Sequence, residues 1–247
     1  MSRRNIRLLI CYDGTRYKGW QRLAGVENTI QGKLERTLSR ILGEEIEISG
    51  SGRTDAGAHA VGQVANFCCD SGLPCEEILS GLRRYLPEDI GIESCQEASP
   101  RFHARLNCKS KTYRYRIWNS ERPCVFQRRF VYVMPDAVDV ELMRQAAEIF
   151  LGEHDFSAFC ANKKMKKSTV RRIDRITIDR DGEELVLTFT ADGFLYNMVR
   201  ILTGTLIEVG RGLRKPSEMQ EIIDAMDRGA AGFTAPAQGL YLVEVEY

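Results

Sequence analysis

Residues 51–60 have the sequence Ser51-Gly52-Arg53-Thr54-Asp55-Ala56-Gly57-Ala58-His59-Ala60. Strand-like runs flank this stretch at residues 46–51 and 62–68, so it has to turn the chain between two strands. Its glycines permit a sharply turned backbone that can approach a ligand closely. Asp55 is the only carboxylate in the stretch, and Arg53, two residues earlier, could face a phosphate group. The sequence therefore predicts a tight loop that presents Asp55 as the candidate catalytic residue.

The glycines of this loop do not match a nucleotide-binding pattern. Gly50 and Gly52 are not followed by a third glycine three residues on, and no Gly-Lys-Ser/Thr sequence ends the loop. The loop therefore matches neither the dinucleotide-binding nor the P-loop pattern. A simpler alternative is that Asp55 caps its own turn, as Asp flanked by glycine often does. The loop alone does not decide between a capping and a catalytic Asp55.

The loop closely resembles the Gly-Arg-Thr-Asp-Ala-Gly-x-His signature of the bacterial tRNA pseudouridine synthase A family. Ala58 stands where we expect Val in many relatives, and this difference is conservative. Further segments resemble that family in the same order along the chain: Tyr12–Thr15, Gly19–Gln21, Thr29–Gln31, Arg101–Arg105, Thr112–Tyr115, Gly152–Phe156, Asn197–Arg200 and Ala235–Leu240. Several ordered segments that cover essentially the whole chain are far more specific than one short motif.

The hydrophobic pattern predicts an α+β protein built from two halves. The first half is expected to have strands at 6–12, 46–51, 62–68 and 90–97 with helices at 29–42 and 76–85. This βαββαβ order resembles the ferredoxin-like (RRM-like) fold, with an antiparallel sheet covered on one face by helices. The second half repeats the theme with strands at 112–118, 130–134 and 239–246, helices at 140–151, 196–210 and 217–227, and a hairpin whose arms are 171–180 and 183–190.

The boundary between the two halves is expected near residues 107–111. We therefore predict an N-terminal half, 1–107, that carries the Asp55 loop, and a C-terminal half, 108–247. The resemblance implies that the two sheets join around a central catalytic cleft.

The charges of the chain are unevenly distributed. The formal net charge is only +1, which argues against a broadly basic nucleic-acid binder. However, residues 101–129 carry nine Lys or Arg and a single acid, Glu121, and residues 163–172 carry six more and no acid. Aromatic residues interrupt the first block, which is typical of an RNA surface that combines phosphate contacts with stacking. The alternative is that both blocks are solvated faces.

Composition limits the remaining function classes. A chain of 247 residues with 43% hydrophobic content can bury a sizeable core. No apolar run is long enough to span a membrane, and the first residues form no apolar signal region, so a cytoplasmic location is expected. The eight cysteines include no Cys-x-x-Cys pair, and there are three histidines. We expect reduced thiols and neither a zinc site nor another metal.

The resemblance implies an isomerase that converts uridine to pseudouridine at positions 38 to 40 of the tRNA anticodon stem-loop, without a cofactor and as a homodimer. Asp55 would act as a nucleophile or remove a proton from the sugar, and the sequence does not distinguish these routes. A buried carboxylate favours its protonated form, so a neighbouring cation is expected. By resemblance, Arg200 takes this role, Tyr113 holds the uracil, and Arg53 meets phosphate or helps to flip the nucleotide.

Arg200 and Tyr113 also have simpler interpretations, and two other functions are alternatives to the isomerase. Arg200 could lie on the exposed side of its helix, and Tyr113 could be an ordinary core aromatic of its strand. A noncatalytic RNA-binding protein with paired ferredoxin-like domains would use the same basic blocks, but it leaves the Asp55 loop unexplained. A glycosidase-like hydrolase would need a second carboxylate in a recognisable motif, and the sequence offers none. No DNA or membrane partner is expected.

Overall fold

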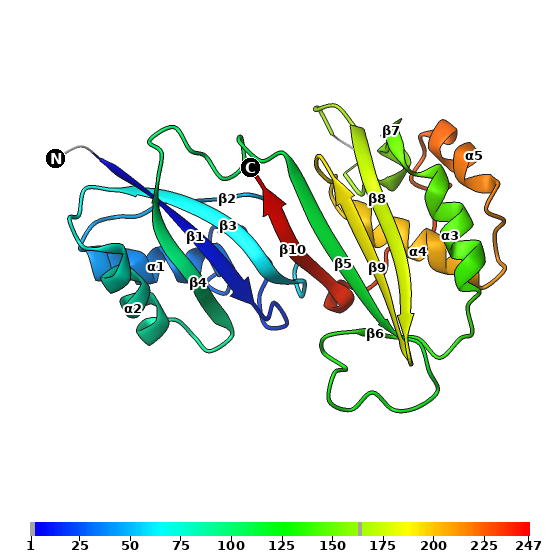
Figure 1. Ribbon diagram of the computed structural model, residues 1–247, viewed down its shortest axis with the longest axis horizontal. Coiled ribbons are helices and arrows are strands. Elements are labelled where there is room, and N and C mark those ends of the chain that lie inside the picture. Colours follow the sequence, from blue (N-terminus) through cyan, green and yellow to red (C-terminus); the bar gives the residue numbers. More distant parts are fainter. Residues whose placement is uncertain (1–2, 163–164) are drawn as a thin grey trace. The chain divides into compact units, whose positions relative to one another are not determined.

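The computed structural model describes residues 3–162 and 165–247. The chain is of the mixed α+β class and divides into two compact units, of which the first comprises Met1–Lys109 and Tyr241–Tyr247 and the second comprises Ser110–Leu240 (Figure 1). Lys163 and Lys164, the first cations of the second basic block, lie outside the described residues. None of the described helices is long and apolar enough to cross a membrane.

The first unit alternates strands and helices along the chain. Its elements are β1 (Arg4–Tyr12), α1 (Ile30–Leu42), β2 (Ile48–Gly50), β3 (His59–Cys69), α2 (Cys75–Tyr85), β4 (Ile90–Ala98) and β10 (Leu240–Glu246). The strands are ordered β4-β1-β3, and both β2 and β10 pair with β3. Besides β1, strand β3 accepts two further partners, because β2 pairs with residues 65–67 and β10 with residues 59–60. The long strand β3 therefore holds the residues that directly follow the Asp55 loop.

Helix α1 shows how the local sequence produces these elements. The side chain of Thr29 accepts a hydrogen bond from a backbone N–H of the first turn, which is the usual role of a Thr N-cap. Gly43, at φ 72°, ends the helix in the left-handed conformation that glycine adopts without steric cost. Between these caps the apolar side chains recur every four residues and are fully buried: Ile30, Leu34 and Leu38.

The described residues of the second unit form a sheet with three α-helices. Its strands are β5 (Ser110–Trp118), β6 (Tyr132–Val133), β7 (Gly152–Asp155), β8 (Val170–Asp181) and β9 (Glu184–Ala191), in the order β5-β9-β8-β7, with β6 paired to β5. The helices are α3 (Val140–Ile149), α4 (Met198–Gly210) and α5 (Glu218–Ala225), with short 3₁₀ turns η1 (Ser157–Phe159) and η2 (Ala237–Gly239). Helix α4 is buried along almost its whole length, so it forms the centre of this unit's core.

The expectation of purely antiparallel sheets is wrong. Strand β10 runs parallel to β3, and β6 runs parallel to β5, so each unit contains both parallel and antiparallel strand pairs. The hairpin of β8 and β9 does form around Asp181 and Gly182, where Gly182 has φ 56°. The strand expected at 130–134 is only two residues long in the structure, because the segment before it is a series of turns.

The end of the chain differs from the predicted division into 1–107 and 108–247. Tyr241 and Leu242 pair with His59 and Ala60, so the last strand completes the sheet of the first unit. A parallel partner for β3 has to arrive through a long connection, and here the whole second unit lies between the two strands in sequence. Periodicity predicts that a strand exists, but it does not identify the strand's partner.

Candidate active site

The start of the Asp55 loop, directly after strand β2, is held by several hydrogen bonds. The N–H of Ser51 donates to the carbonyl of Val64 (2.8 Å), and its hydroxyl donates to Gln63 Oε1 (2.7 Å). Gln63 in turn donates through Nε2 to the carbonyl of Gly52 (2.9 Å). Because Gln63 is fully buried on β3, the start of the loop is held to the body of the sheet.

The middle of the loop is fixed by two aromatic residues from the first unit. The N–H of Trp20 donates to the carbonyl of Thr54 (3.1 Å), and Tyr12 shares a hydrogen bond with the Thr54 hydroxyl (2.7 Å). Trp20 also packs so closely on Gly50 that an added Cβ there would lie 2.6 Å from the indole ring. Thr54, the residue directly before Asp55, is therefore held through both its backbone and its side chain.

Asp55 begins a turn whose geometry requires a glycine. The N–H of Ala58 donates to the carbonyl of Asp55 (3.1 Å), and Gly57, at the third position of the turn, has φ +80°. A type II turn needs a positive φ at this position. Asp55 itself is half-buried, whereas Arg53 is exposed. Among the described residues, none forms a hydrogen bond or ion pair with the Arg53 side chain, so its guanidinium is available to a ligand.

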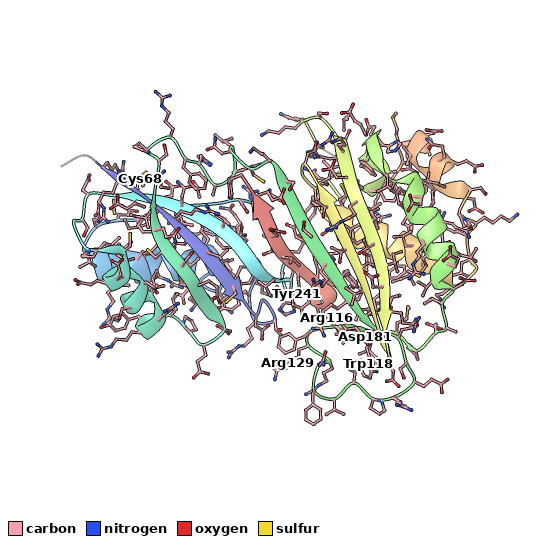
Figure 2. The ribbon with its side chains drawn as sticks, viewed as in Figure 1. Cys68, Arg116, Trp118, Arg129, Asp181 and Tyr241 are labelled. Atoms are coloured by element: carbon pink, nitrogen blue, oxygen red, sulfur yellow. The ribbon has the colours of Figure 1, made fainter. Side chains whose placement is uncertain are left out.

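Gly14 and His59 support the far end of the loop. The N–H of Gly14 donates to His59 Nδ1 (3.1 Å), and the buried imidazole stacks on Tyr241 of β10, with the ring centroids 4.8 Å apart (Figure 2 labels Tyr241). A Cβ on Gly14 would lie 1.8 Å from the carbonyl oxygen of Ala58. The position therefore accepts only glycine unless the loop shifts.

We expect Gly14→Ala to displace the loop and to lower both stability and activity. The clash is with backbone, which cannot rotate away, so a loss of about 1–3 kcal/mol in the free energy of unfolding is expected from overpacking. Urea denaturation measures this change. Gly72→Ala is the matched control, because a Cβ on Gly72 meets nothing within 4 Å. Equal unfolding midpoints for the two variants would show that the loop does not depend on Gly14.

Tyr113 and Tyr115 lie on the same face of β5, as their spacing of two predicts. Tyr113 is buried, and its ring makes an edge-to-face contact with Phe194, at a centroid distance of 5.2 Å and an interplanar angle of 83°. Tyr115 is fully buried and donates its hydroxyl proton to the carbonyl of Pro236 (2.6 Å). Burial raises the pKa of Tyr115, although the charge of Arg200 opposes this shift. Tyr115 is thus a packing residue that lies within the field of Arg200.

Arg200 stands in the first turn of α4 and is half-buried rather than pointing freely into solvent. Its Nε donates to the carbonyl of Ala235 (2.7 Å), and its Nη1 donates to Asn197 Oδ1 (3.0 Å). Asn197 precedes the helix in the left-handed conformation, at φ 62°. Such a backbone is unusual for a non-glycine residue and is more often found at functional sites. The interpretation of Arg200 as a residue on an exposed helix face is therefore wrong.

The four predicted site residues fall into two groups. Arg53 and Asp55 share one loop of the first unit, and Tyr113 and Arg200 belong to the second unit. Asn197 and Ala235, which orient the Arg200 guanidinium, are not among the predicted site residues, although both stand in segments that carry the family resemblance. In the described parts of the chain, no group of three or more His, Cys, Asp or Glu is placed to hold a metal ion.

A search against family models matches residues 9–107 and 146–247 to the tRNA pseudouridine synthase family. The chain belongs to this family. It is therefore a tRNA pseudouridine synthase, an isomerase, and the resemblance found in its sequence is confirmed. Membership decides against the two alternatives, a noncatalytic RNA-binding protein and a glycosidase-like hydrolase.

Relatives of full length agree with this assignment. The tRNA pseudouridine synthase A of Bacillus sp. is 47% identical over 98% of this chain and 99% of its own length. The enzyme of the same name from Acetivibrio thermocellus is 46% identical over 99% of this chain and 100% of its own length. Among solved structures, a chain of the archaeal box H/ACA sRNP Nop10–Cbf5 complex is 14% identical, with a TM-score of 0.37; the alignment covers 82% of this chain and 43% of that chain. This structural likeness is too weak to carry an argument.

Proposed function

We propose that this tRNA pseudouridine synthase uses Asp55 as its catalytic carboxylate and acts on uridines 38 to 40 of the anticodon stem-loop. The observation that carries the proposal is the way the loop is held: separate hydrogen bonds fix Ser51, Gly52 and Thr54, and a glycine-dependent turn follows at once. A carboxylate on a loop restrained in this way is positioned in advance of substrate binding, which is what efficient catalysis requires.

The reaction explains why one carboxylate is enough. The bond from ribose C1′ to uracil N1 breaks, and a bond from C1′ to C5 forms, so no electrons are gained or lost overall and no redox cofactor is needed. Asp55 can form a covalent bond with the substrate as a nucleophile, or it can accept a proton from the sugar. Either role requires the ionised carboxylate.

We assign the supporting roles to Arg200, Tyr113 and Arg53. Arg200 supplies the positive charge that favours the ionised carboxylate, and its guanidinium is pre-oriented by Ala235 and Asn197. Tyr113 offers a ring for stacking on the uracil and a hydroxyl that can help to move the C5 proton. Arg53, whose guanidinium is exposed, binds phosphate as the target nucleotide leaves its stack.

The finer architecture and assembly belong to the same proposal. The order βαββαβ and the strand sequence β4-β1-β3-β2 in the first unit support a ferredoxin-like half. A second such half, a central catalytic cleft and a cytoplasmic location stay predictions. A homodimer, in which one subunit binds the anticodon arm while its partner grips the tRNA body, follows from the family resemblance.

A pseudouridine map of total RNA from cells with and without the gene tests the substrate. We expect marks at tRNA positions 38, 39 and 40 to disappear without the gene and to return when it is supplied again. Marks elsewhere in tRNA serve as an internal control, because other enzymes make them. Unchanged marks at all three positions would contradict the proposal.

A further inference from the structure

A long loop of the second unit exposes an aromatic side chain that none of the described residues covers. Residues 119–131, which we call the arginine loop, connect β5 to β6 (the green excursion beside β6 in Figure 1). Phe126 in this loop is 95% exposed, and its neighbour Val125 is 55% exposed. A phenylalanine in this position contributes almost nothing to the stability of the fold, and an exposed apolar side chain of this size indicates a binding surface.

The arginine loop is held in place at several points. Trp118 Nε1 donates to the carbonyl of Arg122 (2.9 Å), and Arg116 Nη2 donates to Gln127 Oε1 (2.6 Å). Arg116 is itself paired with Glu184 on β9, at 2.9 Å between Nη2 and Oε2. These bonds flank Phe126 on both sides in sequence. The exposure of its ring is therefore built into the fold, and a partner need not order the loop first.

The charge of the arginine loop identifies the partner's chemistry. Arg122, Arg128 and Arg129 are all exposed, and Glu121 is the only acid in the loop. None of the described residues pairs with the Arg129 side chain, which Figure 2 shows on this loop. An exposed aromatic ring among guanidinium groups is the usual means of binding an unpaired nucleotide, with its base on the ring and its phosphate on the cations.

We propose that the arginine loop binds an unpaired nucleotide of the tRNA other than the target uridine, with the base stacked on Phe126 and the phosphate contacted by the neighbouring arginines. A hollow of about 380 Å³ lined by Pro123, Cys124, Val125 and Arg128 opens on the same loop and offers room for the sugar. This inference rests on the proposed use of Tyr113 and Arg200 to bind the target uridine.

The short segment 235–238 contacts both the arginine loop and Arg200, one of the residues proposed to bind the target uridine. Ala235 accepts the hydrogen bond from Arg200, and Gln238, three residues later, donates to the carbonyl of Val131 at the end of the loop (3.2 Å). The carbonyl of Pro236 accepts the hydroxyl of Tyr115, which shares a face with Tyr113. The same segment thus supports the candidate uridine-binding residues and the loop, so one RNA can engage both.

A second copy of this chain is a less suitable occupant. A twofold symmetric contact would place the same patch of each subunit against itself. With the twofold axis at the arginine loop, the loop would face an identical loop with three arginines and one acid, and the like charges would repel.

Two substitutions at one position test the proposal. Phe126→Leu keeps an apolar side chain and removes the aromatic ring, whereas Phe126→Tyr keeps the ring. We expect Phe126→Leu to weaken tRNA affinity roughly tenfold, as for the loss of one stacked base, and Phe126→Tyr to bind as the wild type does. The turnover rate at saturating tRNA should be unchanged in both, because the ring takes no part in the chemistry. Filter binding and steady-state kinetics give the two quantities.

Tyr85→Leu is the matched control, since Tyr85 is also exposed and its ring is already occupied by Arg40 and Arg84 (5.0 and 5.5 Å). We expect this variant to bind tRNA normally. Wild-type affinity in Phe126→Leu would overturn the proposal, and so would a change in sedimentation that shows the ring to be buried between subunits. An active Asp55→Asn enzyme would instead overturn the proposed function, irrespective of the result at Phe126.

Discussion

Asp55→Asn is expected to lower the rate of pseudouridine formation by at least about 10³-fold while tRNA affinity stays within a few fold of the wild type. The amide has the shape of the carboxylate but not its charge, so it can neither form the covalent intermediate nor accept a proton efficiently. Asp55 is half-buried, and its carbonyl, which closes the turn with Ala58, is unaffected by the change. Single-turnover assays at saturating tRNA measure the chemical step directly.

Asp70→Asn is a suitable control, because Asp70 is an exposed carboxylate of the same unit at the end of β3. Asp70→Asn should retain wild-type activity. This result would exclude a general effect on activity of removing one negative charge. Circular dichroism has to show that the Asp55 variant is folded. A folded Asp55→Asn enzyme with appreciable turnover would show that another group performs the chemistry.

The sharp turn that carries Asp55 could be predicted because its glycines stand in one short segment. Three glycines around one aspartate in residues 50–57 indicate a sharp turn that presents a carboxylate, and the structure adds the restraints that hold it. Those restraints come from Tyr12, Trp20 and Gln63, which are distant in sequence. No local pattern specifies that Gln63 bonds Ser51, because the pairing depends on the register of β3 in the sheet.

The parts that sequence did not predict are those fixed by long-range partners. The pattern of alternating residues at 239–246 predicts a strand, but the same pattern fits a strand of either unit, and only the pairing of Tyr241 with His59 places it. Similarly, Arg200 in isolation resembles any polar residue on a helix. Its orientation depends on Asn197 in the left-handed conformation and on a carbonyl 35 residues later in the chain.

Arg200→Met is expected to lower the rate roughly 10²-fold, the usual effect of removing one preorganised electrostatic group. Methionine approximates the length of the arginine side chain but carries no charge, and it leaves the Ala235 carbonyl and Asn197 Oδ1 without their guanidinium donor. Arg200→Lys should recover only a small part of this loss. A single ammonium group on a flexible chain does not reproduce two hydrogen bonds donated from different guanidinium nitrogens.

Arg211→Met is the matched control, since Arg211 caps the opposite end of α4 and is exposed, with only a 3.5 Å ion pair to Asp136. We expect it to turn over tRNA at the wild-type rate. If Arg200→Met loses activity through unfolding, its denaturation midpoint will fall together with the rate. A catalytic role predicts instead a reduced rate at an unfolding midpoint close to that of Arg211→Met. Wild-type turnover in Arg200→Met would remove Arg200 from the proposed site.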